Sequence, residues 1–204
     1  MIKAILFDLD GVLVWTQKLQ ILSTINALKK YCKINDNIKE IIYQTITTQE
    51  KLKILADGNY LNKNDLINIY KEKKKKFNKE IKKRKIFSKK IFLLLKYLKF
   101  RKYKVAVVTN SNKFTTMLIL RKLKIKNFLD LIVTNNLKVK PKPNAGPYKY
   151  AITRLRLKKE NCLILEDSLV GILSAQRSGA RYHKIKKPSE VNLKNIKRLI
   201  KKYS

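Results

Sequence analysis

The sequence is poor in cysteine, histidine, proline and glycine. Its 204 residues include two cysteines, Cys32 and Cys162, one histidine, His183, four prolines and five glycines. Cys162 lies in an apolar stretch typical of a buried strand, so the cysteines favour a reduced, cytoplasmic compartment over a disulfide-stabilised extracellular one. A single histidine disfavours both histidine-based catalysis and a zinc site.

Long apolar runs and acidic residues are also scarce. No run of 18 apolar residues occurs, so we expect no membrane-spanning helix. The chain enters its first apolar stretch directly, which leaves no room for a signal peptide. Only 14 residues are acidic against 49 lysines and arginines, and the formal net charge is +35. Such a charge attracts nucleic acids and other polyanions at low salt.

The densest basic run is KEKKKKFNKEIKKRK at residues 71–85. It lacks the aromatic interleaving expected of a surface on which single strands stack. Lysine greatly outnumbers arginine, and isoleucine and asparagine are abundant throughout, which is the bias of an AT-rich genome. We therefore interpret most of the charge as solvated helix faces, with a functional polyanion surface as the alternative.

Two regions of the chain have different patterns. In residues 16–87, apolar residues recur every three or four positions over 19–31, 38–46 and 50–56, which predicts amphipathic helices. Residues 62–85 predict one or two further, more polar helices. From about residue 88, strands are predicted at 103–110, 128–135, 161–167 and 181–185. Helices are predicted before and between them, at 89–100, 114–125, 146–157 and 168–180.

Strands that alternate with helices at this spacing predict an α/β fold with a doubly wound parallel sheet. Residues 2–8 form an apolar run ended by polar residues and a glycine, which predicts a first strand of the same sheet. We therefore expect an α/β core made of residues 1–15 and 88–204, with a helical cap of residues 16–87 inserted into it.

Polar side chains gather where three of the predicted strands end. The six residues at these ends are Asp8, Asp10, Thr109, Asn110, Glu166 and Asp167. Ligands of open parallel sheets bind beyond the carboxyl ends of the strands. Four carboxylates converging there repel each other without a cation, and a set of oxygen ligands favours Mg²⁺. One carboxylate is then a plausible nucleophile toward phosphorus, with a lysine and a hydroxyl balancing the charge of the phosphoryl group.

Four stretches resemble, in order, the motifs of the haloacid dehalogenase superfamily. They are DLDGVLV at 8–14, VVTNS at 107–111, KPKPN at 140–144 and ILEDSLVGILSA at 164–175. The helical insertion directly after the first motif resembles the branch of beta-phosphoglucomutase-like and phosphoglycolate phosphatase-like enzymes. Two positions depart from the family pattern: Trp15 stands where an aspartate is common and Gln20 where many members have a histidine. Cap closure and acid–base tuning are therefore expected to be altered.

The resemblance implies a role for each matching acidic residue. Asp8 would take the phosphoryl group, and Asp10 would protonate the leaving alcohol and then deprotonate water. Mg²⁺ would be held by the carboxylate of Asp8 and the backbone carbonyl of Asp10. The acidic pair would complete the metal site, Asp167 directly and Glu166 through water.

The resemblance also implies one phosphate-facing lysine in the loop KVKPKPN, which offers Lys140 and Lys142. In the family pattern an aromatic residue commonly falls six positions after this lysine, and the acidic pair begins about 24 positions after it. Counting from Lys142 reaches Tyr148 and Glu166. Counting from Lys140 reaches neither an aromatic nor an acidic residue, so the register selects Lys142.

Further substrate contacts are implied at two places. Thr109 and the backbone amide of Asn110 would bind phosphate oxygens. The stretch ITTQEK at 46–51 stands where this branch has its specificity loop. Thr48 and Lys51 are therefore the residues expected to contact the rest of the substrate.

The sequence as a whole predicts a monomeric, cytoplasmic, Mg²⁺-dependent phosphatase of a small phosphorylated metabolite. Asp10 beside Asp8 favours phosphoryl transfer over dehalogenation, which needs no second carboxylate there. A sugar-phosphate mutase of the same family is the nearest alternative. A nucleic-acid-binding protein on an inactivated scaffold, motivated by the +35 charge, is the alternative from another class.

Overall fold

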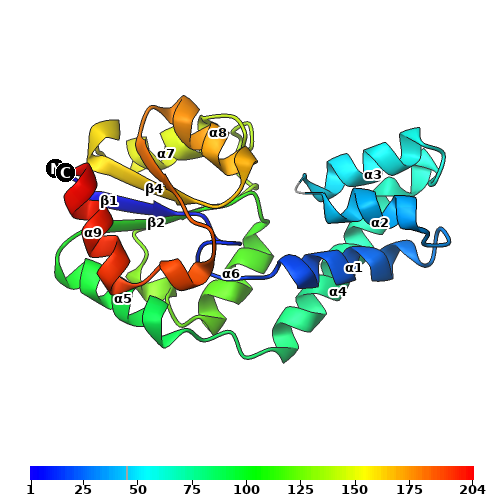
Figure 1. Cartoon of the computed structure of the whole chain (residues 1–204), viewed down its shortest axis with the longest axis horizontal. Helices are drawn as coiled ribbons and strands as arrows, with labels where there is room; N and C mark the ends of the chain where they lie inside the picture. The colour runs from blue at the N-terminus through cyan, green and yellow to red at the C-terminus, as the bar shows by residue number, and fades with distance from the viewer. Residues whose placement is uncertain (45) are drawn as a thin grey trace. The chain divides into compact units, whose positions relative to one another are not determined.

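The computed structural model of the chain describes residues 1–44 and 46–204. These residues form two compact units: Met1–Trp15 together with Lys85–Ser204, and Thr16–Arg84 (Figure 1). We call the first the core unit and the second the cap unit. The chain returns to the core unit at Lys85, whereas the sequence analysis places this boundary after residue 87.

The core unit contains a five-stranded parallel sheet, in the order β3-β2-β1-β4-β5. Its strands are β1 (Ala4–Phe7), β2 (Lys104–Val108), β3 (Leu131–Val133), β4 (Cys162–Glu166) and β5 (Arg181–Lys184). Both β1 and β4 are buried along their whole length, as expected for strands covered on both faces. The predicted doubly wound parallel sheet is confirmed.

Helices follow the strands as the sequence pattern predicts. They are α5 (Lys89–Phe100), α6 (Lys113–Lys122), α7 (Gly146–Arg154) and α8 (Leu169–Ser178). In Figure 1, α7 and α8 lie on one side of the sheet and α5 on the other. The strands are shorter than predicted, and β3 differs most, because Lys126–Phe128 form a 3-10 turn before it begins at Leu131.

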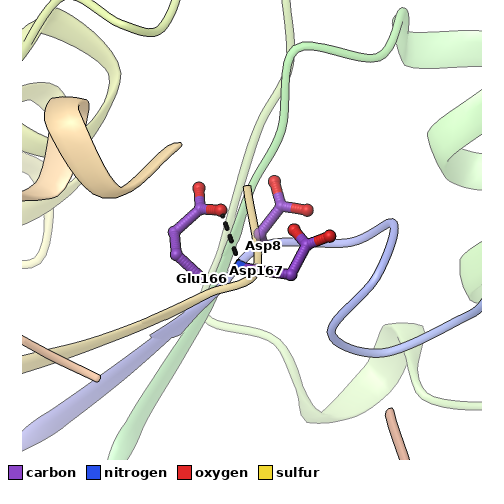
Figure 2. A group of neighbouring side chains, drawn as sticks. All are labelled: Asp8, Glu166 and Asp167. Atoms are coloured by element: carbon purple, nitrogen blue, oxygen red, sulfur yellow. Dashed lines mark hydrogen bonds between the residues drawn. The ribbon is translucent and has the colours of Figure 1, made fainter. Parts of the chain in front are cut away.

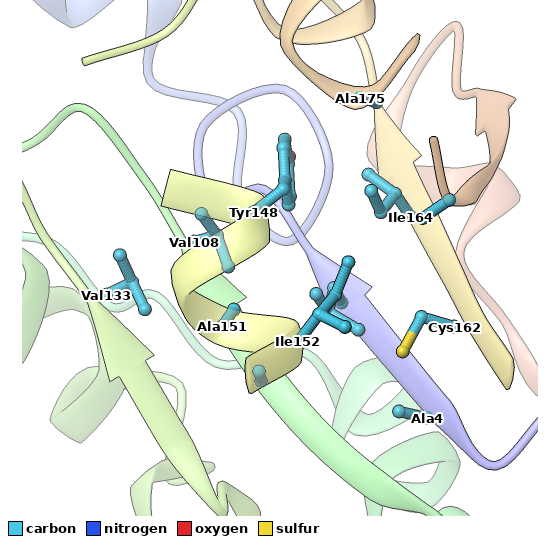
Figure 3. Packing of buried hydrophobic residues seen from close by; sticks show 12 residues of the cluster. Ala4, Val108, Val133, Tyr148, Ala151, Ile152, Cys162, Ile164 and Ala175 are labelled. Carbon is cyan, nitrogen blue, oxygen red and sulfur yellow. The ribbon is translucent and has the colours of Figure 1, made fainter. Parts of the chain in front are cut away.

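The side of the sheet under α7 forms an apolar cluster (Figure 3). The helix contributes Tyr148, Ala151 and Ile152, which pack on residues of β1, β2 and β4 such as Leu6 and Ile164. Tyr148 is fully buried in this cluster. This packing fixes α7, and hence the loop before it, against the carboxyl ends of the strands.

A final helix, α9 (Leu193–Tyr203), has no counterpart in the sequence analysis, which ends its elements at residue 185. Asn192 caps its first turn by accepting a hydrogen bond from the amide of Asn195. Ile196 and Leu199 face the protein interior, while the basic residues of the helix are exposed.

The cap unit is helical. It contains α1 (Gln17–Leu28), α2 (Asp36–Tyr43), α3 (Thr48–Asp57) and α4 (Leu66–Lys83). The predicted helix 38–46 includes residue 45, which lies outside the described residues. Asn35 caps α2, and Thr47 with Glu50 forms a capping box at the start of α3, which satisfies the first amides of each helix.

The basic run 71–85 falls largely in α4. The buried side of this helix is a row at every fourth position, Ile69, Lys73, Phe77 and Ile81, the spacing of one helix face. Lys73 contacts the side-chain oxygen of Gln20 in α1 and the ring of Phe77. Over the described stretches 1–44 and 46–204, no helix combines the length and apolarity needed to cross a membrane.

Candidate active site

The pairing of β1 with β2 and with β4 brings three of the predicted motifs to one edge of the sheet. Phe7 pairs with Val107 of β2 and with Leu165 of β4. The residues that follow these strands therefore lie side by side. The amide of Asp8 continues the ladder by donating to the carbonyl of Leu165 at 3.0 Å.

A buried lysine connects two of the carboxylates. Lys142 Nζ lies 2.6 Å from Asp8 Oδ1 and 2.6 Å from Glu166 Oε1, and it donates to the carbonyl of Val108 at 2.7 Å. Lys142 and Glu166 are buried, and the side chain of Asp8 is nearly so. Lys140 is exposed. The structure thus brings Lys142, the lysine that the register selects, to Asp8.

The acidic pair lies at the end of β4, with Glu166 as its last residue and Asp167 directly after it. Figure 2 shows Glu166 and Asp167 beside Asp8, with the amide of Asp167 donating to Glu166 Oε2 at 3.2 Å. Glu166 Oε1 accepts a second hydrogen bond, from the Tyr148 hydroxyl at 2.6 Å. Both oxygens of Glu166 therefore have protein donors.

Two glycines leave room for these carboxylates. A Cβ on Gly11 would lie 1.9 Å from Asp167 Oδ2, and a Cβ on Gly171 would lie 2.0 Å from the Glu166 carboxylate carbon. Gly11 also has a φ of +92°, a backbone conformation that favours glycine. The two carboxylates therefore pack directly on backbone in the first-motif turn and in the first turn of α8.

Asp10 lies in the turn after β1 and is partly exposed. Its backbone forms a bridge with Val14, and the Gly11 amide donates to the Val14 carbonyl at 2.7 Å. The group of carboxylates close enough to share a metal comprises Asp8, Glu166 and Asp167, without the carboxylate of Asp10.

Thr109 and Asn110 follow β2, next to Asp8. Thr109 is buried, and its hydroxyl oxygen accepts a hydrogen bond from the Ser111 amide at 3.1 Å. The side chain of Asn110 is paired with the backbone of Lys142 in both directions, each hydrogen bond being 3.1 Å. The sequence pattern predicts a role only for the backbone amide of Asn110 and does not predict this side-chain contact, which fixes the loop that carries Lys142.

The pKa values reflect crowded negative charge. Burial raises the pKa of Asp8 well above its usual value, and the ammonium of Lys142 acts against this shift. Burial, with Glu166 and Asp10 nearby, raises the pKa of Asp167 to about 6. Burial acts to lower the pKa of Lys142, but Asp8 and Glu166 outweigh it, so the pKa is raised. One fixed ammonium thus offsets only part of the carboxylate charge.

The donor set fits a divalent cation. One oxygen from each of Asp8, Glu166 and Asp167 can be chosen so that all three lie within 4.8 Å of one another. Hard, oxygen-only ligands of this kind suit Mg²⁺. A cation there would also stabilise the ionised forms of carboxylates whose pKa values are raised without it.

The two expected substrate residues of the cap unit have local roles. Thr48 is the first residue of α3. Lys51 Nζ donates to the carbonyl of Ile42 near the end of α2, at 2.5 Å, and is half-buried. Their contact with substrate stays a prediction. Of the two departures from the family pattern, Trp15 is half-exposed and Gln20 contacts Lys73.

Comparisons with known proteins show the family of the chain. A family model described as haloacid dehalogenase-like hydrolase matches residues 5–185. A putative pyrophosphatase of Clostridium perfringens is 28% identical over 183 residues, which are 89% of this chain and 82% of that protein. A phosphorylated carbohydrates phosphatase of Thermotoga maritima is 25% identical over 181 residues, 87% of this chain and 82% of that protein.

The fold has solved counterparts. A beta-phosphoglucomutase of Clostridium difficile superposes with a TM-score of 0.79 at 21% identity, over 100% of this chain and 99% of that one. At this identity the likeness concerns the fold, a parallel sheet with a helical insertion.

Proposed function

The chain belongs to the haloacid dehalogenase-like hydrolase family and is a hydrolase of the phosphatase type, and from this premise we propose that it removes phosphate from a small phosphorylated metabolite with the help of Mg²⁺. Asp8 carries the phosphoryl group between the two half-reactions. The observation that carries the proposal is the meeting of Asp8, Lys142 and the acidic pair at one edge of the sheet.

In the first half-reaction, a carboxylate oxygen of Asp8 attacks phosphorus and forms an acyl phosphate. The bond from phosphorus to the ester oxygen breaks, and Asp10 donates its proton to that oxygen, so the alcohol leaves neutral. Asp10 suits this task because it follows Asp8 by two residues and is partly exposed toward solvent.

In the second half-reaction, water attacks the phosphorus of the acyl phosphate. Asp10, now ionised, takes a proton from this water. The bond between phosphorus and the Asp8 oxygen breaks, which releases inorganic phosphate and returns Asp8 as a carboxylate and Asp10 as an acid. Atoms and protons balance over the two halves: one ester and one water give one alcohol and one phosphate.

Lys142 supplies fixed positive charge for this transfer. Its ammonium touches Asp8 Oδ1, so it lies beside the atom that bonds phosphorus and offsets charge there. We assign Thr109 and the amide of Asn110 to the phosphate oxygens, because both follow β2 next to Asp8.

We assign Mg²⁺ to the carboxylates of Asp8 and Asp167 and the backbone carbonyl of Asp10, and we assign Glu166 a contact with the ion through water. When bound, the ion supplies electrostatic stabilisation of the phosphoryl oxygens and orients them for in-line attack. The chain's own part is to hold these acidic groups in place, with Asp167 packed on Gly11 and Glu166 packed on Gly171.

The names of the relatives suggest where to search for the substrate. The Clostridium perfringens relative is named a putative pyrophosphatase and the Thermotoga maritima relative a phosphatase of phosphorylated carbohydrates. We therefore propose sugar phosphates and inorganic pyrophosphate as the first substrates to test, with Thr48 and Lys51 contacting the part beyond the phosphate.

The test is release of inorganic phosphate from a library of phosphorylated metabolites by the full chain with Mg²⁺, with Asp8→Asn as control. We expect at least one small ester to be hydrolysed by the wild-type chain and not by the variant. Conversion of a sugar 1-phosphate to its 6-isomer without free phosphate would instead identify a mutase. No release from any ester, together with salt-sensitive binding of DNA or RNA, would favour the nucleic-acid alternative.

A further inference from the structure

The hydroxyl of Tyr148 does more than packing requires. Its ring lies in the apolar cluster of Figure 3, where a phenylalanine would fill the same space. A buried hydroxyl is costly unless it has a hydrogen-bond partner. Here the hydroxyl donates to Glu166 Oε1 at 2.6 Å. Helix α7 therefore contacts the candidate site through this side chain.

Tyr148 helps to fix Glu166 in one orientation. Glu166 Oε1 accepts from both Tyr148 and Lys142, each at 2.6 Å. Its Oε2 accepts from the Asp167 amide at 3.2 Å. The backbone of Gly171 closes one side, since a Cβ there would lie 2.0 Å from the carboxylate carbon. Turning the carboxylate would therefore break hydrogen bonds on both oxygens.

The orientation of Glu166 in turn fixes Lys142. An ammonium has three N–H donors, and those of Lys142 meet Asp8 Oδ1, the Val108 carbonyl and Glu166 Oε1. If Glu166 turned away, Lys142 would lose one of these three acceptors. Its ammonium would then be held less firmly toward Asp8.

We propose that the Tyr148 hydroxyl is a positioning group that keeps the Glu166 carboxylate turned toward Lys142. In this orientation Glu166 accepts a hydrogen bond from Lys142, and the carboxylates that bind the cation directly are those of Asp8 and Asp167. Glu166 lies close enough to bind the cation directly, because one of its carboxylate oxygens lies within 4.8 Å of oxygens of both Asp8 and Asp167. Without the hydroxyl, Glu166 has one hydrogen-bond donor fewer. Its carboxylate can then turn and become a third carboxylate ligand of the cation, which breaks its hydrogen bond with Lys142.

The proposal predicts two effects of opposite sign in Tyr148→Phe. The Kd for Mg²⁺, titrated into the substrate-free full chain by calorimetry, falls by ~3- to 10-fold, because a freed carboxylate joins the ligands. In the same variant kcat falls by ~10-fold while KM stays within ~2-fold, as for an interaction that matters mainly in the transition state. A merely structural loss would weaken both metal binding and turnover.

A second variant disturbs Glu166 from the opposite side. Gly171→Ala places a Cβ against the Glu166 carboxylate while leaving Tyr148 in place, and alanine is well tolerated in a helix. We expect the same pair of effects. The control is Tyr150→Phe on the same helix, where the ring packs at the edge of the same cluster; its metal affinity and kcat should match those of the wild-type chain.

Three outcomes would overturn the proposal: unchanged Mg²⁺ affinity in Tyr148→Phe, affinity and kcat falling together, or a wild-type chain that binds no Mg²⁺. The kinetic arm rests on the proposed function, whereas the calorimetric arm does not. If the wild-type chain released no phosphate from any ester, the proposed function would fail, and the change in Mg²⁺ affinity would still support or overturn the role of Tyr148.

Discussion

The core unit and the cap unit contain equal numbers of acidic residues, seven each, but use them differently. In the core unit, four of the seven stand at the ends of β1 and β4, where three of them could share a metal ion. In the cap unit most of the acidic residues lie at helix ends or in surface ion pairs, such as Glu50 in a capping box and Glu72 beside Lys30. Among the described residues, acidic side chains thus gather closely at the candidate active site.

Lysines of the two units differ in the same way. Lys142 of the core unit meets two carboxylates, and its pKa is raised despite burial. Lys51 of the cap unit donates to a neutral backbone carbonyl, and burial lowers its pKa. The charge of the hydrogen-bond partner, more than burial itself, thus decides whether the pKa of a buried or half-buried lysine is raised or lowered.

The largest test of this contrast removes the nucleophile. Asp8→Asn keeps the shape but lowers the nucleophilicity of the side chain, so turnover should fall by several orders of magnitude. Phosphate release is measured at saturating substrate, and circular dichroism checks that the fold is retained. Activity above about 1% of the wild-type value would contradict the assignment of Asp8.

The next test compares two lysines of one loop. Lys142→Ala should lower kcat by at least ~100-fold, because charge beside Asp8 is lost. It should also lower the free energy of unfolding by ~3–5 kcal/mol, because two buried carboxylates lose their cation. Lys140→Ala, an exposed neighbour, should change kcat by less than ~5-fold. The reverse ranking of kcat would overturn the register.

A third test concerns metal and pH. The pKa of Asp167 is raised from 3.8 to about 6, so between these values the folded chain keeps a proton that the unfolded chain has lost. The stabilisation that comes from the protonated Asp167 carboxyl in the folded chain is therefore lost as pH rises from about 4 to 6. In EDTA, Asp167→Asn should match the wild-type Tm near pH 4 and exceed it by ~2–4 °C at pH 7.

Mg²⁺ should cancel this difference, because the ion stabilises the ionised carboxylate of the wild-type chain only. Thermal unfolding with EDTA and with Mg²⁺, at both pH values, gives the full comparison. EDTA should also abolish activity and Mg²⁺ restore it. A Tm difference that does not depend on pH would contradict the raised pKa.

The smallest expected effect is in the cap unit. Lys51→Met removes the donor to the Ile42 carbonyl, which should cost ~1 kcal/mol of stability. If Lys51 also contacts substrate, KM rises by about 5-fold with kcat unchanged. Lys53→Met, at an exposed position nearby, should leave both values unchanged. Lower stability with an unchanged KM would restrict Lys51 to its structural role.

Much of the core unit could be predicted because its signals are local. The apolar run before Asp8 and the alternation of strands and helices after residue 88 are each visible in a short window of sequence. The spacing from Lys142 to Tyr148 and Glu166 was informative only through the resemblance to the family. Order and spacing were sufficient to predict that these segments meet, since parallel strands end at the same edge of a sheet.

The supporting contacts could not be predicted in this way. Asn110 holds the backbone of a residue 32 positions later, and Tyr148 donates to an oxygen 18 positions later. Such contacts depend on the side-chain geometry of two elements after they have packed. The helix α9 was missed for a different reason: its few buried apolar residues, Ile196 and Leu199, are set among lysines that resemble the composition of the whole chain.

The central position of β1 has a consequence for synthesis on the ribosome. Both neighbours of β1 in the sheet are made after the cap unit, and β4 ends only at Glu166. At ~5–20 residues per second, the fully apolar strand that ends at Phe7 waits roughly 10–30 s for its last partner. The whole cap unit is synthesised during this interval, including α4, which packs on α1. The first strand of the core to be synthesised is therefore also the strand that waits longest for its partners, first β2 and then β4.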